Sequence, residues 1–154
     1  MSVAYFDTSA LLKRYVTEAG SEWVKTLLSA DDAPFIVTSH LAVVEAACAF
    51  ARRAREGNLP AEALDNLLRL FEYDVAYRYH VLELSPATID AARDLALQHP
   101  LRVYDAVHLA TAWLANQELV RAGKPPLTFV CADDRLVGIA SATGLLTDNP
   151  HGHA

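Results

Sequence analysis

Short apolar runs alternate with longer amphipathic segments along the chain. The run VAYF at residues 3–6 is typical of a strand, and after Asp7 apolar residues return every three or four positions, the spacing of a helix. This alternation repeats to the end of the sequence. We expect strands at residues 3–6, 35–38, 80–84, 127–131 and 145–147. We expect helices from residue 8 to about 15, from residue 20 onward, and over about 40–55, 60–77, 86–98, 103–122 and 134–142.

Glycine and proline residues set several boundaries between these segments. Gly57 ends the helix that starts after Ser39, whose hydroxyl can cap it, and Pro60 suits the first turn of the next helix. Strands that alternate with helices imply parallel crossovers. The pattern therefore predicts an α/β fold with a mainly parallel central sheet covered by helices on both faces. Because no repeat or linker interrupts it, we expect one domain over residues 1–150 and a disordered tail at residues 151–154.

Composition excludes several broad classes of protein. The 154 residues are 53% hydrophobic and 21% charged, as in ordinary globular proteins, and they suffice to bury one core. No apolar run approaches the roughly 20 residues of a membrane span, and no signal-like segment opens the sequence. We therefore expect a soluble, cytoplasmic protein. Cys48 and Cys131 lie in apolar surroundings, which favours buried free thiols over a disulfide or a metal site.

The net charge of −6 limits how the protein can bind a polyanion. Proteins that bind nucleic acids by bulk attraction usually carry a basic excess. Here the negative charge of a polyanionic ligand must be neutralised locally, either by a bound cation or by basic clusters. The clusters are Lys13 with Arg14 and Arg52 with Arg53 and Arg55.

Two acids follow predicted strands. Asp7 comes directly after residues 3–6, and Asp133 comes two residues after the strand at 127–131. Ligands of open parallel sheets bind beyond the carboxyl ends of the strands, so both acids are expected in that crevice. Taken singly, each acid is better explained as the cap of the helix that follows, because Asp caps helices well.

Two further acids stand alone in apolar helices. Glu45 is the only polar residue in LAVVEAACAFA, which is apolar on every side and therefore expected to be largely buried. A buried carboxylate needs a cationic partner, a proton or a metal. Asp105 is likewise an acid in a mostly apolar helical segment, LRVYDAVHLATAWLA. It lies in the first turn, where the helix dipole favours the ionised carboxylate. An internal ion pair with Arg52 or Arg102 is the alternative for Glu45, and His108 is interpreted as a core histidine rather than a ligand.

The four acids together indicate a metal site. Two carboxylates 4 Å apart repel by about 4 kcal/mol at an effective dielectric of about 20, so a cluster of four needs a cation to stay ionised. Oxygen ligands of this kind suit Mg²⁺ or Mn²⁺. Such ions activate water and stabilise the leaving oxygen of a phosphodiester, so the predicted chemistry is metal-assisted phosphodiester hydrolysis.

The motifs also resemble those of a known family. FDTSALLKRY, TSHLAVVEAACAFARR, RVYDAVHLATA and FVCADDRLVGIASATGL, in this order and spacing, are similar to the PIN-domain ribonucleases, and within them to VapC-type toxins of toxin–antitoxin pairs. The resemblance spans nearly the whole chain. It implies a three-layer α/β/α PIN-like fold, endoribonuclease activity that depends on Mg²⁺ or Mn²⁺, a homodimer and a cognate VapB-type antitoxin.

The resemblance assigns roles to particular residues. Asp7, Glu45, Asp105 and Asp133 match the family's catalytic, metal-binding acids. Ser9 matches a small hydroxyl residue that supports the first acid. The remaining assignments are auxiliary: Thr8 as a turn or support residue, Ser39 as a helix-opening residue, and Asp134 as a first-turn residue or an extra ligand. Cys131 departs from the pattern, because many relatives have Thr or Ser there and a thiol is a poorer hydrogen-bonding partner.

The basic clusters gain a function from the same resemblance. Lys13, Arg14, Arg52 and Arg53 are candidates for contacts to RNA phosphates near the acids, or they are solvated helix ends. The amphipathic helix at 60–77 is a candidate dimer or antitoxin surface, and core packing explains it equally well.

Three other functions fit the sequence less well. A catalytically weak PIN-like module, acting mainly by binding antitoxin or RNA, is the main alternative. Phosphatases with an aspartate nucleophile need a second acid two residues after the first, where this chain has Ser9. A dinucleotide-binding enzyme needs a GxGxxG motif, which does not follow the first strand.

Overall fold

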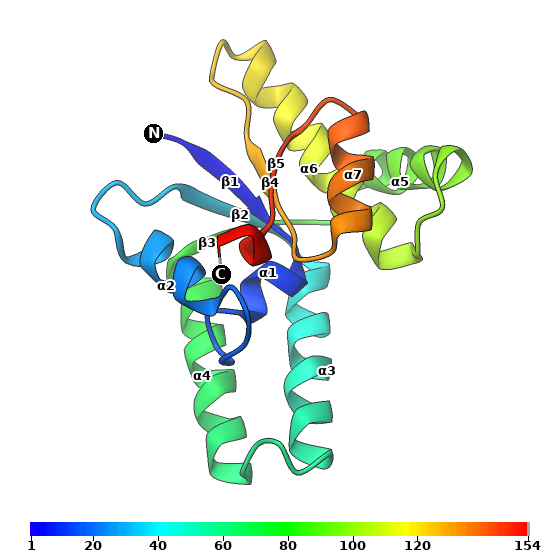
Figure 1. Cartoon of the computed structure of the whole chain (residues 1–154). Helices are drawn as coiled ribbons and strands as arrows, with labels where there is room; N and C mark the ends of the chain where they lie inside the picture. The colour runs from blue at the N-terminus through cyan, green and yellow to red at the C-terminus, as the bar shows by residue number, and fades with distance from the viewer. Residues whose placement is uncertain (154) are drawn as a thin grey trace.

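The structure, a computed structural model, describes residues 1–153 and is built on a five-stranded sheet in the order β3-β2-β1-β4-β5 (Figure 1). Every neighbouring pair of strands is parallel. The strands are β1 (Val3–Phe6), β2 (Phe35–Ser39), β3 (Tyr79–Leu82), β4 (Thr128–Val130) and β5 (Leu146–Asp148). The helices are α1 (Thr8–Leu12), α2 (Ser21–Ser29), α3 (Leu41–Arg55), α4 (Ala61–Tyr77), α5 (Pro86–Gln98), α6 (Val103–Arg121), α7 (Asp134–Ala142) and the 3-10 helix η1 (Pro150–His153).

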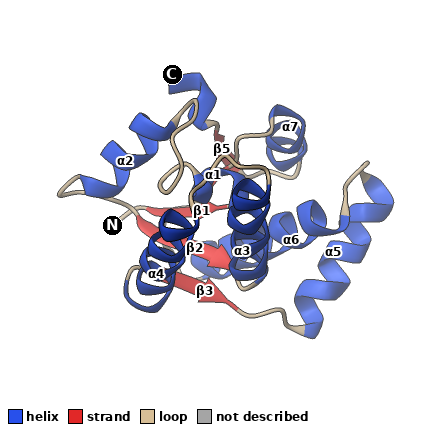
Figure 2. Cartoon of the chain, turned by 90° about the horizontal axis from the view of Figure 1, so that it is seen from below, coloured by secondary structure: helices blue, strands red, loops and turns tan. Residues whose placement is uncertain are grey.

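The central strand β1 divides two hydrophobic cores. Ala4 and Phe6 point into a core shared with α1, α3 and α4, whereas Tyr5 points into a second core shared with α6 and α7. This follows from the two-residue period of a strand. Helices consequently cover both faces of the sheet, as Figure 2 shows from below. The predicted α/β/α arrangement with a parallel sheet is confirmed.

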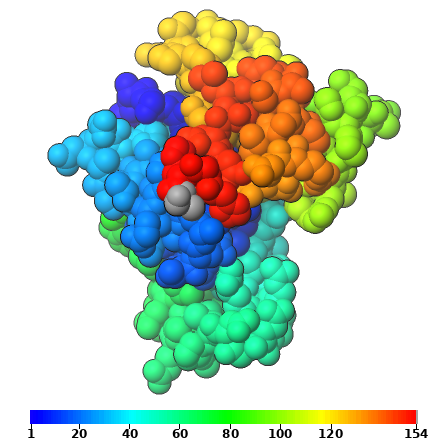
Figure 3. All heavy atoms as spheres, viewed as in Figure 1, coloured from blue at the N-terminus to red at the C-terminus, as the bar shows by residue number. Residues whose placement is uncertain are grey.

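The helices α3 and α4 form a hairpin that projects beyond the sheet (Figure 1). They lie side by side and form a separate lobe on the surface in Figure 3. Only part of α3 is covered: Phe50 is fully buried, but the side chain of Val44 is 61% exposed and Cys48 is also exposed. The expectations of a largely buried 41–51 segment and of a buried Cys48 were therefore wrong, because in the lobe α3 packs on one side only.

The register between β1 and β4 brings the carboxyl ends of these two strands together. Phe6 pairs with Val130, and the backbone N–H of Asp7 donates to the Val130 carbonyl at 3.1 Å. The segments that follow these two strands are therefore neighbours. This edge of the sheet carries both Asp7 and the loop that leads to Asp133.

The chain after β5 differs from the expected disordered tail. Residues Pro150–His153 form η1, and the His153 ring stacks on Trp23 of α2 with centroids 4.2 Å apart. The side chain of His153 also lies 2.7 Å from an Asp148 oxygen. The expected tail residue Ala154 lies outside the described residues. No helix within residues 1–153 is both long and apolar enough to span a bilayer.

Candidate functional site

Asp7 begins the candidate site at the carboxyl end of β1. Its Oδ1 accepts hydrogen bonds from the Ala10 backbone N–H at 3.0 Å and from the Ser9 hydroxyl at 2.7 Å. Asp7 is thus the N-cap of α1, as the capping explanation predicts, but only its Oδ1 caps the helix and Oδ2 does not. The Ser9 oxygen also accepts from the Ala132 backbone N–H at 3.0 Å. Ser9 therefore joins the ends of β1 and β4 and orients Asp7, the supporting role expected of it.

Glu45 reaches the same region from α3. Its Oε1 accepts a hydrogen bond from the Thr8 hydroxyl at 2.8 Å and lies 2.6 Å from His108 Nε2. The expected alternatives, ion pairs with Arg52 or Arg102, are not formed within the described residues. Thr8 is thus more than a turn residue, because it holds the carboxylate of Glu45 next to the end of β1.

His108 connects Glu45 to the core. The side chain is only 2% exposed, and its Nδ1 lies 2.8 Å from the Tyr5 hydroxyl. Burial raises the pKa of Tyr5, and the nearby carboxylates of Asp7 and Glu45 raise it further. Tyr5 therefore stays protonated, and its hydroxyl can donate a hydrogen bond to Nδ1 of His108. The proton of the neutral imidazole is then on Nε2, which donates a hydrogen bond to Glu45. His108 is a satisfied core histidine, as interpreted, that also orients an acid.

Asp105 and Asp133 share one arginine. Arg135 Nη2 lies 3.1 Å from Asp105 Oδ2 and 3.8 Å from Asp133 Oδ2. Asp133 also caps α7, since its Oδ1 accepts from the Arg135 backbone N–H at 2.9 Å. Burial raises the pKa of Asp105, Arg135 opposes this rise, and the negative charges of Asp133 and Asp7 add to it. These acids are close enough to act on each other electrostatically.

The four acids come from four separate parts of the chain. The structure brings them toward the carboxyl edge of the sheet through three connected groups: Asp7 with Ser9, Glu45 with Thr8 and His108, and Asp105 with Asp133 through Arg135. Among residues 1–153, no three histidine, cysteine or acidic side chains lie close enough together to coordinate one ion as they stand. The expected four-acid cluster is thus looser than a closed metal centre. Its donors are nevertheless all oxygens, the ligand type of Mg²⁺ and Mn²⁺.

The auxiliary residues divide into near and distant ones. Asp134 is exposed, and its Oδ1 accepts a hydrogen bond from Asn149 at 2.6 Å. Ser39 is the last residue of β2 and its hydroxyl accepts from the Leu41 N–H at 3.1 Å, a structural role as expected. Cys131 is buried beneath Ser9 at 3.8 Å, and burial together with Asp7 raises the pKa of its thiol.

The structure places the basic residues differently from the expected RNA contacts. The side chain of Lys13 is buried, and its Nζ donates to Glu18 Oε1 at 3.1 Å and to the Ala19 carbonyl at 2.7 Å. A residue in this position cannot reach a phosphate. Arg14 pairs with buried Asp74, and Arg53 pairs with Glu18 at 3.0 Å. Of the four, Arg52 is exposed and forms no ion pair within the described residues.

Two residues of the site, Arg135 and Tyr5, were not predicted for it from the sequence. Arg135 directly follows the AspAsp pair, and its spacing from Asp133 was available as a signal. Tyr5 lies in a strand that reads only as apolar, and its contact with His108 spans 103 residues. Nothing local indicates that contact.

Comparisons with known proteins identify the family. A sequence model of the PIN domain matches residues 4–124. The chain belongs to the PIN domain family. The matched segment includes Asp7, Glu45 and Asp105, while Asp133 lies beyond it.

The PIN-domain chain is similar over nearly its whole length to two curated relatives. It is 35% identical over 144 residues to Ribonuclease VapC45 and to Ribonuclease VapC49 of Mycobacterium tuberculosis, covering 94% of this chain and 93% of each relative. The resemblance to VapC-type PIN proteins inferred from the motifs is thereby confirmed.

Solved structures share the PIN fold. VapBC2 from Rickettsia felis, solved with a DNA fragment from its promoter, matches with a TM-score of 0.65 at 14% identity, covering 96% of this chain and 98% of that one. FitAcB from Neisseria gonorrhoeae matches with a TM-score of 0.63 at 15% identity, covering 96% and 97%. A toxin–antitoxin complex from Klebsiella pneumoniae gives 0.60 at 16% identity, again covering 96% and 97%. At these identities the likeness concerns the fold.

Proposed function

We propose that this chain is a VapC-type toxin that cleaves RNA as an endoribonuclease dependent on Mg²⁺ or Mn²⁺. The observation that carries the proposal is the convergence of Asp7, Glu45, Asp105 and Asp133 on one edge of the sheet in a PIN domain related to VapC ribonucleases. The proposed substrates are tRNA, rRNA or mRNA. The proposal includes a single domain over residues 1–150 and a cytoplasmic location.

The proposed ligands of the metal are the four acids. A divalent cation bound there would supply an activated water and neutralise charge on the phosphate. The protein side chains do the rest. Ser9 holds Asp7, and Thr8 and His108 hold Glu45. Without the cation, the guanidinium of Arg135 neutralises part of the charge of Asp105 and Asp133, a role that the cation would take over. No side chain is required as a nucleophile.

The proposed partners are a VapB-type antitoxin and a second copy of the chain. Support comes from the names of the similar structures, which include toxin–antitoxin complexes. The α3–α4 lobe is a candidate surface for either partner, because it projects from the sheet and exposes Val44, Leu70 and Tyr73.

The test is cleavage of a broad panel of tRNA and rRNA by the purified chain. We expect cleavage in Mg²⁺ or Mn²⁺, loss of cleavage in chelator, and a fall of at least about a hundredfold in Asp7→Asn. Asp134→Asn is the matched control, because Asp134 is exposed and bound to Asn149. An intact panel with wild-type protein, or equal cleavage by Asp7→Asn, would contradict the proposal.

A catalytically weak binding module is the second candidate. The ion pair between Arg135 and Asp105 favours it, since a protein side chain already neutralises part of the acid group. Titration of Mn²⁺ into the purified chain separates the two functions. A ribonuclease binds the ion at the acids and loses binding in Asp7→Asn, whereas a binding module shows no such dependence.

A further inference from the structure

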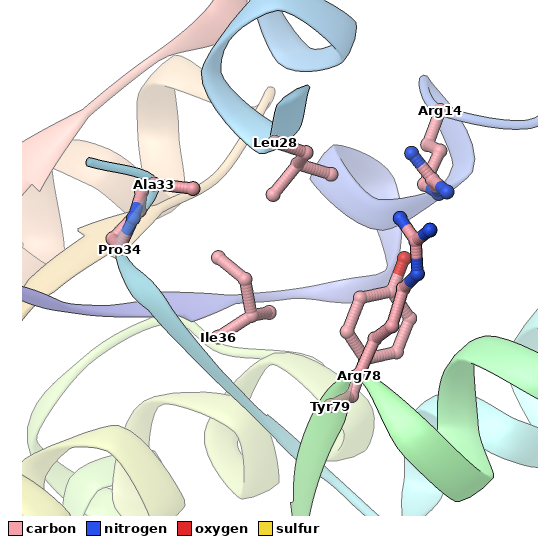
Figure 4. A pocket seen from close by; sticks show the side chains of 7 residues that line it. All are labelled: Arg14, Leu28, Ala33, Pro34, Ile36, Arg78 and Tyr79. Carbon is pink, nitrogen blue, oxygen red and sulfur yellow. The ribbon is translucent and has the colours of Figure 1, made fainter. Parts of the chain in front are cut away.

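A pocket lies on the opposite side of the fold from the acids, near the amino ends of β2 and β3. Its volume is about 250 Å³, and Figure 4 shows the side chains that line it. Ile36 is the second residue of β2 and Tyr79 the first residue of β3, whereas the acids follow the carboxyl ends of strands. The pocket is therefore distinct from the candidate ribonuclease site. Its lining residues are Arg14, Leu28, Ala33, Pro34, Ile36, Arg78 and Tyr79.

Two arginines in this pocket share a single buried carboxylate. Asp74 is fully buried; its Oδ2 accepts from Arg14 Nε at 2.8 Å and from the Tyr15 hydroxyl at 2.7 Å. Arg78 Nε lies 3.3 Å from the other oxygen, Oδ1, which has no hydrogen-bonding partner within the described residues. Two positive charges thus face one negative charge, and the three groups carry a net charge of +1.

The two guanidinium groups present their remaining donors to the pocket. Each uses Nε toward Asp74, and their terminal nitrogens make no hydrogen bond to residues 1–153. In Figure 4 the two groups lie next to each other beside the Tyr79 hydroxyl. Because Nε of Arg14 is fixed on a buried acid, its terminal N–H groups are preorganised for an incoming anion.

The number of donors favours a phosphate over a carboxylate. A carboxylate offers two oxygens, which one guanidinium fork satisfies, whereas a phosphate offers three oxygens that two arginines can share. A phosphate monoester also carries a charge of about −1.5 to −2 at pH 7. This charge is larger than the net charge of +1 of Arg14, Arg78 and Asp74, so the phosphate can interact with both arginines.

The opposite wall of the pocket is apolar. Leu28, Ala33, Pro34 and Ile36 face the arginines across the cavity in Figure 4. Inorganic phosphate would leave this wall in contact with water. A sugar or base attached to the phosphate would cover it. The volume of about 250 Å³ lies just below the roughly 300–1,000 Å³ of typical ligand pockets, so only a small ligand can enter.

We propose that this pocket binds the 5′-phosphate of a nucleotide, with Arg14 and Arg78 as the anion-binding residues. The nucleotide is either free or the 5′-terminal residue of an RNA chain. The proposal does not depend on the ribonuclease activity, because the pocket uses none of the four acids and requires no metal.

The test is calorimetric titration of the full chain in EDTA, which prevents metal-mediated phosphate binding at the acids. We expect AMP to bind more tightly than inorganic phosphate, and adenosine to show no binding. Arg78→Gln should weaken AMP binding by about tenfold, the effect of losing a charged hydrogen bond. The matched control is Arg69→Gln, because Arg69 is an exposed arginine of α4, the helix that ends directly before Arg78; this variant should bind AMP as wild type does.

A short RNA with or without a 5′-phosphate distinguishes the two sources of the nucleotide. Tighter binding of the phosphorylated RNA indicates an RNA end, and binding of AMP alone indicates a free nucleotide. Ala33→Leu is a second variant, which fills part of the cavity and keeps both arginines. It should weaken the binding of AMP more than the binding of inorganic phosphate. The proposal is overturned if millimolar AMP does not bind, if Arg69→Gln loses as much affinity as Arg78→Gln, or if a dicarboxylate binds as tightly as AMP.

Discussion

At the scale of single residues, the Tyr5 hydroxyl tests whether the orientation of Glu45 matters. Tyr5→Phe keeps the ring stacked on Phe129 but leaves the buried Nδ1 of His108 without its partner. We expect a loss of about 1–3 kcal/mol in the free energy of unfolding. Cleavage should fall by roughly 10–100-fold because the tautomer of His108 that donates to Glu45 is no longer fixed.

Urea denaturation and cleavage rates measure these two effects. Tyr104→Phe is the control, since Tyr104 is partly exposed and its hydroxyl contacts only Arg102 in the described structure. A destabilised Tyr5→Phe protein with a wild-type cleavage rate would show that the contact is structural only.

Asp105 gives a prediction for the pH dependence of stability. Its pKa is raised by burial, so the native state binds a proton more tightly than the unfolded state. The contribution of Asp105 to stability is therefore fully present below its unfolded pKa of about 3.9 and falls as the pH rises through the raised native value. Asp105→Asn should remove this fall and melt at a higher temperature than the wild type at pH 7, while abolishing cleavage.

Melting curves of both proteins between about pH 3 and 8 measure the difference. The stability of the wild type relative to the variant should decline across the window above about pH 3.9. A relative stability that increases with pH would mean that the ion pair with Arg135 outweighs the cost of burial.

Arg135 is expected to compete with a divalent cation for Asp105. The guanidinium is partly exposed and its ion pair is of the kind worth about 0.2–1 kcal/mol. Arg135→Gln should therefore bind Mn²⁺ up to about fivefold more tightly by calorimetry. Arg121→Gln, which breaks an exposed pair with Glu118, is the control. Weaker Mn²⁺ binding in Arg135→Gln would instead assign Arg135 a supporting role in the site.

The sequence was informative about acids and uninformative about their partners. Glu45 and Asp105 stood out because each is an acid in an apolar helix, and the structure gives each a polar partner as that position requires. The partners themselves lie 63 and 30 residues away. Such contacts are set by how α3, α6 and α7 pack, which no local spacing encodes.

At the scale of elements, periodicity predicted the strands and helices within a few residues of their bounds. The first helix is the exception, since α1 ends at Leu12 instead of continuing to about residue 15. Residues after it turn so that Lys13 enters the interior beside Glu18 and His151. The helical spacing in the sequence did not reveal this turn, because Lys13 is buried by contacts with the loop before α2 and with η1.

The contact between α2 and η1 is sensitive to one glycine. Gly20 has a φ of +84° at the start of α2, and a Cβ there would lie 2.8 Å from Pro150. Gly20→Ala should lower the free energy of unfolding by more than the roughly 1–2 kcal/mol of left-handed strain. Gly57→Ala is the control, since Gly57 has a φ of +77° but open space around its Cβ position. Urea denaturation measures the free energy of unfolding of both variants. Equal losses in Gly20→Ala and Gly57→Ala would show that η1 can move away from the added methyl group without loss of stability.

At the scale of the whole molecule, the parallel sheet separates two kinds of charge. Its carboxyl edge carries the acids, and the pocket with Arg14 and Arg78 lies near its amino ends. The net charge of −6 therefore conceals a local positive site, and bulk charge is a poor guide to where a phosphate can bind. Arg14 and Arg53 of the basic clusters pair with Asp74 and Glu18, contacts that the sequence did not reveal.

Binding of a divalent cation should stabilise the whole fold, because it relieves repulsion among carboxylates that folding brings together. At a Mg²⁺ concentration about 100 times Kd, the free energy of unfolding should rise by about 2.7 kcal/mol, and Tm should rise with it. Melting curves at matched ionic strength, with NaCl in place of MgCl₂, measure the effect. The shift should be lost in Asp7→Asn and kept in Asp134→Asn, because the Asp134 carboxylate is exposed and bonded to Asn149. An unchanged wild-type Tm at millimolar Mg²⁺ would mean that folding alone does not assemble the site, so that RNA or a partner must bring the acids together.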